Sequence, residues 1–309
     1  MIIHNLVICP KCNTENQDNY NYCYNCAFPL KEKIREKEIT RLMGIAIGYE
    51  IVNLFDKAAE IYETIVQEKP SYADVRYKLA LIYELQGKYE KVIKQLQEAL
   101  TINPDFIQAR IKLANILMTL GNYQEALIEY KTVLTTKIKY NFADIYNNIG
   151  IIYEKMGNIK QAKAYYMKSI SMNPKFAKPY YNLGNVMFAK GNYDMAIINY
   201  RKAISLKFEV PEVYNNLALA MYKQGNMKEA EQNLLKAIEI DKNFFEAYYN
   251  LTLIYLQSEQ LQKANEIIQQ IKQRFAYSQD INYLEKTIEK KYKEKYKKEQ
   301  INNIEKTIK

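Results

Sequence analysis

The residues best suited to chemistry in this chain are its cysteines, and all four lie close together near the N-terminus. They form two pairs, Cys9-x2-Cys12 and Cys23-x2-Cys26, separated by ten residues. Two such pairs can place four sulfurs at the corners of a tetrahedron, which is the closed coordination of a structural zinc site. We therefore expect one structural Zn2+ per chain on these four cysteines, with no open coordination position left for catalysis.

Two other uses of the cysteines are weighed against zinc. A cytosolic setting disfavours disulfides, and a redox Cys-x-x-Cys usually occurs as one pair near a βαβ pattern, which this sequence lacks. The segment resembles the short zinc ribbons at bacterial N-termini, although Asn13 and Ala27 stand where those ribbons usually carry glycine. We expect the metal to fold the segment, because so few residues bury little apolar area. His4 is interpreted as a surface residue rather than a ligand, since four sulfurs suffice.

The rest of the chain offers little for catalysis. Its single histidine lies in the N-terminal tail, so the repeats cannot assemble a histidine-centred acid/base or nucleophile pair. The nine glycines all have places in a repeated helical pattern, which leaves none for a loop that cradles phosphate. We therefore predict a protein that is not an enzyme and has no small-molecule substrate.

Glycine marks the register of that repeated pattern. Gly87, Gly121, Gly157, Gly191 and Gly225 are spaced 34, 36, 34 and 34 residues apart. Each ends one helical pattern, where a residue that accepts positive φ can close the helix. Asn53 takes this place in the first unit and Glu259 in the last. The resulting seven units are 39–72, 73–106, 107–142, 143–176, 177–210, 211–244 and 245–278.

Two further places in each unit carry small residues, which let paired helices approach closely. One follows the turn residue by five positions: Ala58, Val92, Ala126, Ala162, Ala196, Ala230 and Ala264. The other lies on the preceding helix: Ala46, Ala80, Ala114, Gly150, Gly184, Ala218 and Thr252. Larger apolar residues at spacings of three and four fill the remaining core places. Each unit is thus predicted to be a helix, a turn and a second helix.

This pattern resembles the tetratricopeptide repeat, and the resemblance covers 240 of 309 residues. It is carried by an aromatic at the fourth place, leucine at the seventh, a small residue at the eighth and alanine at the twentieth, most completely in residues 180–196. The usual tryptophan is absent, and the third unit has two extra residues near Thr135 to Asn141. The resemblance implies an all-α, right-handed superhelical solenoid. We expect a zinc ribbon at 1–30, a charged linker or helix lead-in at 31–38 and a basic amphipathic capping helix at 279–309.

In the tetratricopeptide fold the first helix of each unit lines the concave side, so a recurring residue becomes a row. The sixth place reads Gly44, Lys78, Lys112, Asn148, Asn182, Asn216 and Asn250. A carboxamide both donates and accepts hydrogen bonds, so four amides can pair with a peptide backbone. This resembles the asparagine ladder of O-linked N-acetylglucosamine transferase and kinesin light chain. The alternative is an unused solvated row, because the chain contains 29 asparagines. We include Asn185 among the candidate peptide-binding residues.

A second comparison is the two-carboxylate clamp of chaperone-adaptor repeats. Asn115, Asn148 and Lys178 stand where that clamp has two asparagines and a lysine, and they join the candidate peptide-binding residues. Ile111 and Asn182 replace two of its cations, which removes much of the charge-assisted hydrogen bonding. Capture of a chaperone tail is therefore not expected.

The C-terminal segment is strongly basic. Residues 286–298 hold seven lysines and two glutamates, whereas the whole chain has a mild formal charge of +9. An apolar stripe at helical spacing runs through Ile281, Leu284, Ile288, Tyr292 and Tyr296. The favoured interpretation is a helix that caps the seventh unit. The alternative is a helix that docks on an anionic membrane or on nucleic acid.

Taken together, these patterns predict a protein-interaction scaffold that binds an extended peptide segment of a partner protein in its concave groove. The runner-up is an adaptor that uses the zinc ribbon and the basic helix on nucleic acid or a membrane. No segment approaches 18 consecutive apolar residues, and Met1 to Ile8 lacks the features of a signal peptide. We expect a cytoplasmic protein.

Overall fold

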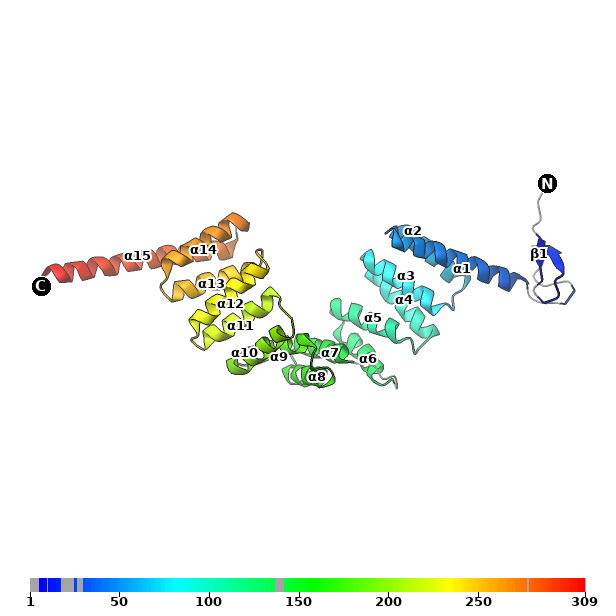
Figure 1. Cartoon of the computed structure of the whole chain (residues 1–309), viewed down its shortest axis with the longest axis horizontal. Helices are drawn as coiled ribbons and strands as arrows, with labels where there is room; N and C mark the ends of the chain where they lie inside the picture. Colours follow the sequence, from blue (N-terminus) through cyan, green and yellow to red (C-terminus); the bar gives the residue numbers. More distant parts are fainter. Residues whose placement is uncertain are drawn as a thin grey trace. The chain divides into compact units, whose positions relative to one another are not determined.

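The computed structural model describes residues 6–9, 11–17, 25–26, 30–136, 142–276 and 278–308. Contacts divide the chain into two units, which we call unit 1 (residues 1–137) and unit 2 (residues 138–309). The boundary lies in the segment 135–141, where the sequence places the two extra residues of the third repeat. Residues 137–141 of this segment lie outside the described part. Each unit is built from helices that follow one another in chain order (Figure 1).

Unit 1 begins with an antiparallel hairpin in which Val7 of one strand lies opposite Asn16 of the other. Three helix pairs follow the hairpin. The elements are β1 (Leu6–Ile8), β2 (Glu15–Gln17), α1 (Leu30–Ile51), α2 (Phe55–Glu68), α3 (Ala73–Leu85), α4 (Tyr89–Ile102), α5 (Ile107–Thr119) and α6 (Tyr123–Leu134). Because α1 already begins at Leu30, residues 31–38 are helical and lead directly into the first repeat.

Unit 2 contains four helix pairs and a long terminal helix. The elements are α7 (Ala143–Lys155), α8 (Ile159–Met172), α9 (Ala177–Ala189), α10 (Tyr193–Ser205), α11 (Pro211–Lys223), α12 (Met227–Ile240), α13 (Phe245–Gln257), α14 (Leu261–Arg274) and α15 (Gln279–Ile308). Within a pair, the first helix packs on the second, and the second packs on the first helix of the next repeat. The first helices α7, α9, α11 and α13 also contact one another in succession. This is the all-α solenoid that the sequence predicts.

The small residues lie where the paired helices meet, as predicted. All seven residues of the set that follows the turn are fully buried, from Ala58 to Ala264. On the facing helix, Gly184 packs under the ring of Tyr200, and a Cβ at this glycine would lie 2.5 Å from the ring atom Cε1. Gly150 and Tyr166 repeat the arrangement one unit earlier. Small side chains are therefore required because tyrosine rings fill the space between the helices.

The turns between paired helices also have the predicted conformation. The five turn glycines have φ between 69° and 83°, the left-handed region that glycine enters without steric cost. Asn53 and Glu259, which replace glycine in the outer repeats, have φ of 57° and 58°. Asparagine visits this region readily, whereas glutamate is strained there.

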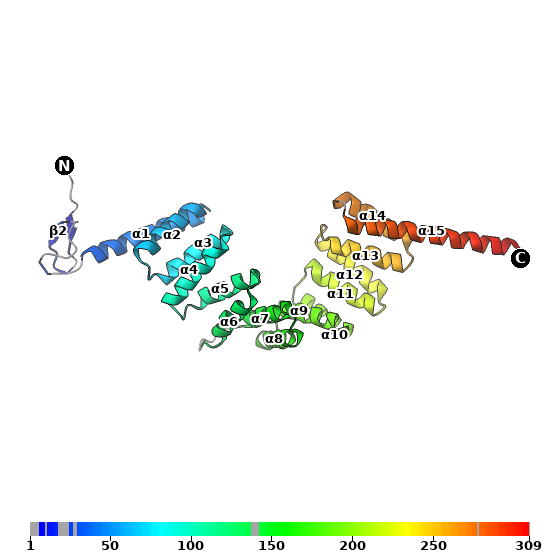
Figure 2. The same cartoon turned by 180° about the vertical axis from the view of Figure 1, so that it is seen from behind.

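The terminal helix α15 is buried for only part of its length. Ile281, Leu284 and Ile288 are at most 5% exposed against α13 and α14, whereas Tyr292 and Tyr296 are 43% and 64% exposed. In both views the C-terminal half of α15 extends past α14 (Figures 1 and 2). The predicted apolar stripe therefore packs over its first half and lies in solvent over its second. Among the described residues, no helix is both long and apolar enough to cross a membrane.

Candidate functional site

The hairpin of unit 1 brings three cysteines together. The Sγ atoms of Cys9, Cys12 and Cys26 all lie within 4.8 Å of one another, and Cys9 is fully buried. The Sγ atoms of Cys9 and Cys26 are 3.6 Å apart, well beyond a disulfide bond and close to the roughly 3.8 Å edge of a tetrahedron with 2.3 Å zinc–sulfur bonds. The fourth predicted ligand, Cys23, lies outside the described residues, as does His4.

The turn between the strands shapes this cluster. Asn13 has φ of 55°, the left-handed conformation that glycine would adopt after the first cysteine pair, and its backbone N–H donates to the carbonyl of Cys9 at 2.8 Å. The Sγ of Cys12 lies 3.1 Å from Oγ1 of Thr14. These contacts fix two sulfurs on one tight turn, so the residues present fit a tetrahedral metal ion.

The four predicted amides lie in unit 2 on the first helices of four successive repeats. We call Asn148 on α7, Asn182 on α9, Asn216 on α11 and Asn250 on α13 the amide row. All four side chains are half-buried, so each is within reach of solvent on one side. The row is therefore confined to one unit, in which the successive first helices contact one another.

Hydrogen bonds connect the amide row from one repeat to the next. Nδ2 of Asn182 donates to Oδ1 of Asn147 at 2.9 Å, and Nδ2 of Asn250 donates to Oδ1 of Asn215 at 2.8 Å. The two acceptors are buried and equivalent, because residues 143–148 and 211–216 share the sequence Tyr-Asn-Asn at their ends. Within the described residues, no donor contacts Oδ1 of Asn182 or Asn250. Each of these amides thus has an acceptor and a second N–H available for a guest.

The middle of the row uses a different set of partners. Nδ2 of Asn216 lies 3.2 Å from the hydroxyl of Tyr181 and 3.1 Å from Oδ1 of Asn185. The Tyr200 hydroxyl also donates to that Asn185 oxygen, at 2.8 Å. Asn185 thus links the core of one repeat to the row, and Asn115 likewise accepts from the buried hydroxyl of Tyr130 in unit 1. The structure gives both of these predicted binding residues a packing role.

A basic pocket of about 480 Å³ opens at the α7 end of the row. Asn148 lines it together with Lys175, Lys178 and Lys207, and Asp144 is the carboxylate among its lining residues. Phe176 and Phe208 supply apolar walls. The loop that carries Lys175 is held by the hydroxyl of Tyr180, which donates to the carbonyl of Pro174 at 3.2 Å. The pocket unites two sequence-predicted residues, Asn148 and Lys178.

An acidic pocket of about 270 Å³ opens at the other end of the row. It is lined by Asn250, Glu246, Phe245 and Tyr249 of α13 and by Asp280 of α15. The Phe245 and Tyr249 rings lie with their centroids 5.9 Å apart. Burial raises the pKa of Tyr249, and the negative charge of Asp280 raises it further. The terminal helix therefore contributes a charged group to this pocket.

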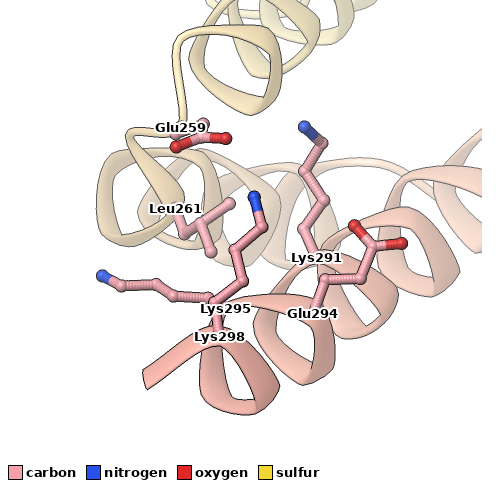
Figure 3. A pocket seen from close by; sticks show the side chains of 6 residues that line it. All are labelled: Glu259, Leu261, Lys291, Glu294, Lys295 and Lys298. Atoms are coloured by element: carbon pink, nitrogen blue, oxygen red, sulfur yellow. The ribbon is translucent and has the colours of Figure 1, made fainter. Parts of the chain in front are cut away.

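The basic half of α15 forms a third, smaller pocket. Lys291, Lys295 and Lys298 of α15 surround a space of about 120 Å³ with Glu259 of the α13–α14 turn and Leu261, the first residue of α14 (Figure 3). Lys290 pairs with Glu294 at 4.0 Å along the helix. Most of the lysines in this half of α15 are exposed. Positive charge therefore gathers beyond the part of α15 that packs on the repeats.

Comparison with protein families agrees with the helix pairs. Models described as TPR repeat match residues 184–225 and 222–258, and models described as tetratricopeptide repeat match 143–176 and 165–198. The chain carries tetratricopeptide repeats. In unit 1, residues 52–133 match the model of anaphase-promoting complex, cyclosome, subunit 3. No curated protein sequence matches the chain.

Solved structures show the same fold. A tetratricopeptide repeat protein from Parabacteroides merdae is 18% identical over 82% of this chain and 99% of its own, with a TM-score of 0.62. PilW, a type IV pilus biogenesis factor, is 18% identical over 69% of this chain and 98% of its own, with a TM-score of 0.59. The pilF protein of Pseudomonas aeruginosa is 15% identical over 69% and 96%, with a TM-score of 0.58. Tetratricopeptide repeat proteins generally act as protein-interaction scaffolds.

Apart from Lys178, the charged residues that line the two pockets were not among the predicted site residues, although the sequence carries a signal for them. The second place of each first helix, with α15 taken as the start of an eighth unit, reads Asp144, Lys178, Glu212, Glu246 and Asp280. Lys178 is the cation among these five residues, so the sign of the charge at this place changes between the units. A comparison of this place across the units would have identified it.

Proposed function

We propose that unit 2 is a non-catalytic scaffold surface that holds an extended segment of a partner protein along the amide row. The observation that carries this proposal is the half-buried position of equivalent amides on four contacting helices. A peptide backbone presents a donor and an acceptor at each residue, and a carboxamide can satisfy either. The row therefore suits a guest whose side chains vary.

The hydrogen bonds between the repeats support a binding role because they fix the amides before a guest arrives. Asn182 and Asn250 are each held by one N–H bond, so ordering them on binding costs less conformational entropy than ordering a free side chain. The opposing interpretation is that these bonds only join the repeats. The two roles differ in what happens when the amides are removed.

The test is to replace Asn182 and Asn216 with alanine and to measure retention of partner proteins captured from a cell lysate by the full chain. We expect at least tenfold weaker retention of the captured partner. The matched control is Asn199→Ala with Asn233→Ala, because both amides lie on the second helices α10 and α12 and donate to a carbonyl four residues earlier at 2.7 Å. Equal retention by both double variants would contradict a binding role for the amide row.

We also propose that Cys9, Cys12, Cys23 and Cys26 bind one structural Zn2+ in a reduced, cytoplasmic protein. The support is the placement of three sulfurs at mutual distances compatible with one ion. Bound zinc would supply a covalent-strength cross-link that ties the hairpin to the second cysteine pair. In this proposal the cysteine cluster has a structural role at the hairpin, and the repeats bind the partner.

Metal analysis of the reduced full chain tests the zinc proposal. We expect one zinc per chain in the wild type and in His4→Ala, and loss of zinc in Cys9→Ser. Wild-type protein without zinc, or Cys9→Ser with its zinc retained, would overturn the assignment.

A second candidate function belongs to the C-terminal half of α15, where exposed Tyr292 and Tyr296 alternate with lysines. We propose it as an alternative contact with nucleic acid or an anionic membrane, since both ligands attract lysine and accept tyrosine rings. The comparison is between the full chain and a chain that ends at Glu289, with single-stranded DNA and phosphatidylserine vesicles as probes. Salt-sensitive binding that the shorter chain loses would support it, and equal binding by both chains would remove it.

A further inference from the structure

The two pockets at the ends of the amide row occupy equivalent places in the repeat but carry opposite charge. Both contain a first helix and the beginning of the next unit, α7 with the start of α9 in one case and α13 with the start of α15 in the other, and the α7 pocket is also lined by Lys207 and Phe208, which follow α10. Lys178 and Asp280 are the second residues of α9 and α15. The residue that the next unit contributes to this site is thus a cation at one end of unit 2 and an anion at the other, while the first helix contributes a carboxylate, Asp144 or Glu246, at both ends.

The charges in both pockets are available to a ligand. Among the described residues, Lys175 and Lys178 have no carboxylate within 4.0 Å, and Lys207 has only Glu209 at 3.9 Å. Glu246 and Asp280 likewise form no ion pair within the described part of unit 2. All five side chains are exposed at the pocket edges. An incoming group of opposite charge would therefore not have to displace an existing short ion pair.

The pocket walls fit side chains rather than bare ions. Phe176 and Phe208 flank the lysines, so an acidic residue could pack its aliphatic stem on the rings while its carboxylate meets the ammonium groups. Phe245 and Tyr249 flank the two carboxylates at the other end. Rings next to carboxylates suit lysine or arginine, which combine ion pairing with cation–π contact.

The distance between the pockets sets the length of the guest. The first helices α7, α9, α11 and α13 contact in succession, and packed helices lie about 8–10 Å apart, so three steps span roughly 30 Å. An extended chain covers about 3.3 Å per residue, which corresponds to roughly nine residues. The amide row lies between the pockets along this path.

We propose that unit 2 selects an extended peptide with opposite charges at its two ends: an aspartate or glutamate in the basic pocket, and a lysine or arginine about nine residues away in the acidic pocket. This rests on the proposed function of the amide row and adds the chemistry of the partner to it. The terminal helix then has a binding role besides its packing role, because Asp280 completes the acidic pocket.

The experiment is selection from a random dodecapeptide library displayed on phage, with the full chain as target. Three targets are used in parallel: the wild type, Lys175→Glu with Lys178→Glu, and Glu246→Lys with Asp280→Lys. The wild type is expected to enrich peptides with an acid and a base about nine positions apart. The first variant should enrich a cation in place of the acid, and the second an acid in place of the cation.

The best wild-type peptide is then synthesised and its binding is measured by fluorescence anisotropy. We expect at least tenfold weaker binding to each charge-reversed variant, and recovery when the corresponding charge of the peptide is reversed. If a charge-reversed variant has a weaker helical circular dichroism signal than the wild type, a neutral variant replaces it. The neutral variants are Lys175→Gln with Lys178→Gln and Glu246→Gln with Asp280→Asn. Their loss of peptide affinity should be smaller than the loss caused by charge reversal.

The outcomes separate this inference from the proposed function. Enriched peptides without charge bias, or the same peptides from all three targets, would overturn the charge selection. If binding of such peptides is still lost in Asn182→Ala with Asn216→Ala, the amide row stands as a peptide site. A wild-type chain that enriches no peptide would overturn both proposals.

Discussion

The tyrosine rings buried inside the repeats decide which residue can stand opposite them. Tyr166 and Tyr200 are at most 1% exposed, and each ring covers a glycine of the facing helix. A tyrosine buries a large apolar area but must also satisfy its hydroxyl. Tyr166 does so on a carboxylate oxygen of Glu154 at 2.6 Å, whereas Tyr200 uses Asn185 at 2.8 Å. Both hydroxyls therefore have an acceptor, and burial raises the pKa of both tyrosines.

Replacing Gly184 with alanine should lower the stability of unit 2. The added methyl would lie 2.5 Å from the Tyr200 ring, and such overpacking costs about 1–3 kcal/mol. The helix propensity of alanine returns about 1 kcal/mol, so we expect a net loss of about 1 kcal/mol in the free energy of unfolding. Thermal and urea unfolding measure it. The control is Gly48→Ala in α1, where no atom lies within 4 Å of the new Cβ and stability should rise.

The same tyrosines predict how stability depends on alkaline pH. Burial, followed by the hydrogen bond to Glu154, raises the pKa of Tyr166 well above its usual value near 10. Above pH 10 the folded chain keeps this proton while the unfolded chain loses it. The contribution of Tyr166 to the free energy of unfolding is therefore fully present below pH 10 and decreases as the pH rises above 10. Each such tyrosine contributes a slope of about 1.4 kcal/mol per pH unit. Tyr166→Phe should reduce the slope by that amount in urea titrations, and an unchanged slope would contradict the assignment.

At the scale of the element, the first half of α15 is packed on the repeats and the second half is exposed to solvent. Its first three turns bury Ile281, Leu284 and Ile288 on the last helix pair, and they replace the neighbour that an eighth repeat would have provided. Lys272 of α14 reaches Glu285 of α15 at 2.7 Å at the edge of this contact. Beyond residue 289 the helix has no such buried face among the described side chains. The two halves can therefore be removed separately.

Ending the chain at Gln279 should destabilise the last repeat, because the apolar face of α14 loses its cover. Complete burial of an isoleucine or leucine contributes about 1.5–3 kcal/mol, so we expect a loss of several kcal/mol and faster amide exchange in α13 and α14. The chain that ends at Glu289 is the control, since it keeps the three buried residues. If both truncated chains unfold at the same temperature, α15 does not act as a cap.

At the scale of the whole molecule, the sequence predicts the repeats better than it predicts the site. Helix pairs follow from local signals, namely the turn residues with positive φ, the small residues between helices and the spacing of apolar residues. The contacts of the amide row could not be predicted in this way. They depend on which neighbouring repeat supplies Asn147 or Asn215, and this requires the relative rotation of the stacked helices.

The boundary between the units could not be predicted from the sequence either. The insertion near Thr135 was visible, yet nothing in the spacing indicated that contacts would divide the chain there. The role of Asp280 was not predicted for a related reason. This residue of the terminal helix lines the acidic pocket only because α15 packs on the last helix pair. Both features depend on packing between elements and not on the pattern within one element.

The division into two units predicts that each folds alone. In a solenoid, stability comes from contacts between neighbouring repeats, and a cut at residue 137 leaves the contacts within each unit in place. Fragments 1–137 and 138–309 should have circular dichroism spectra that sum to that of the full chain. Because the amide row and both charged pockets lie in unit 2, fragment 138–309 should bind a selected peptide within about threefold of the full-chain affinity, a difference under 1 kcal/mol.

The matched control is a cut at Gly191, which separates α9 from its packing partner α10. That cut should leave α9 without cover for Leu183 and Val186, and neither fragment should retain peptide binding. Weak binding by a folded fragment 138–309 would contradict the assignment of the peptide site to unit 2.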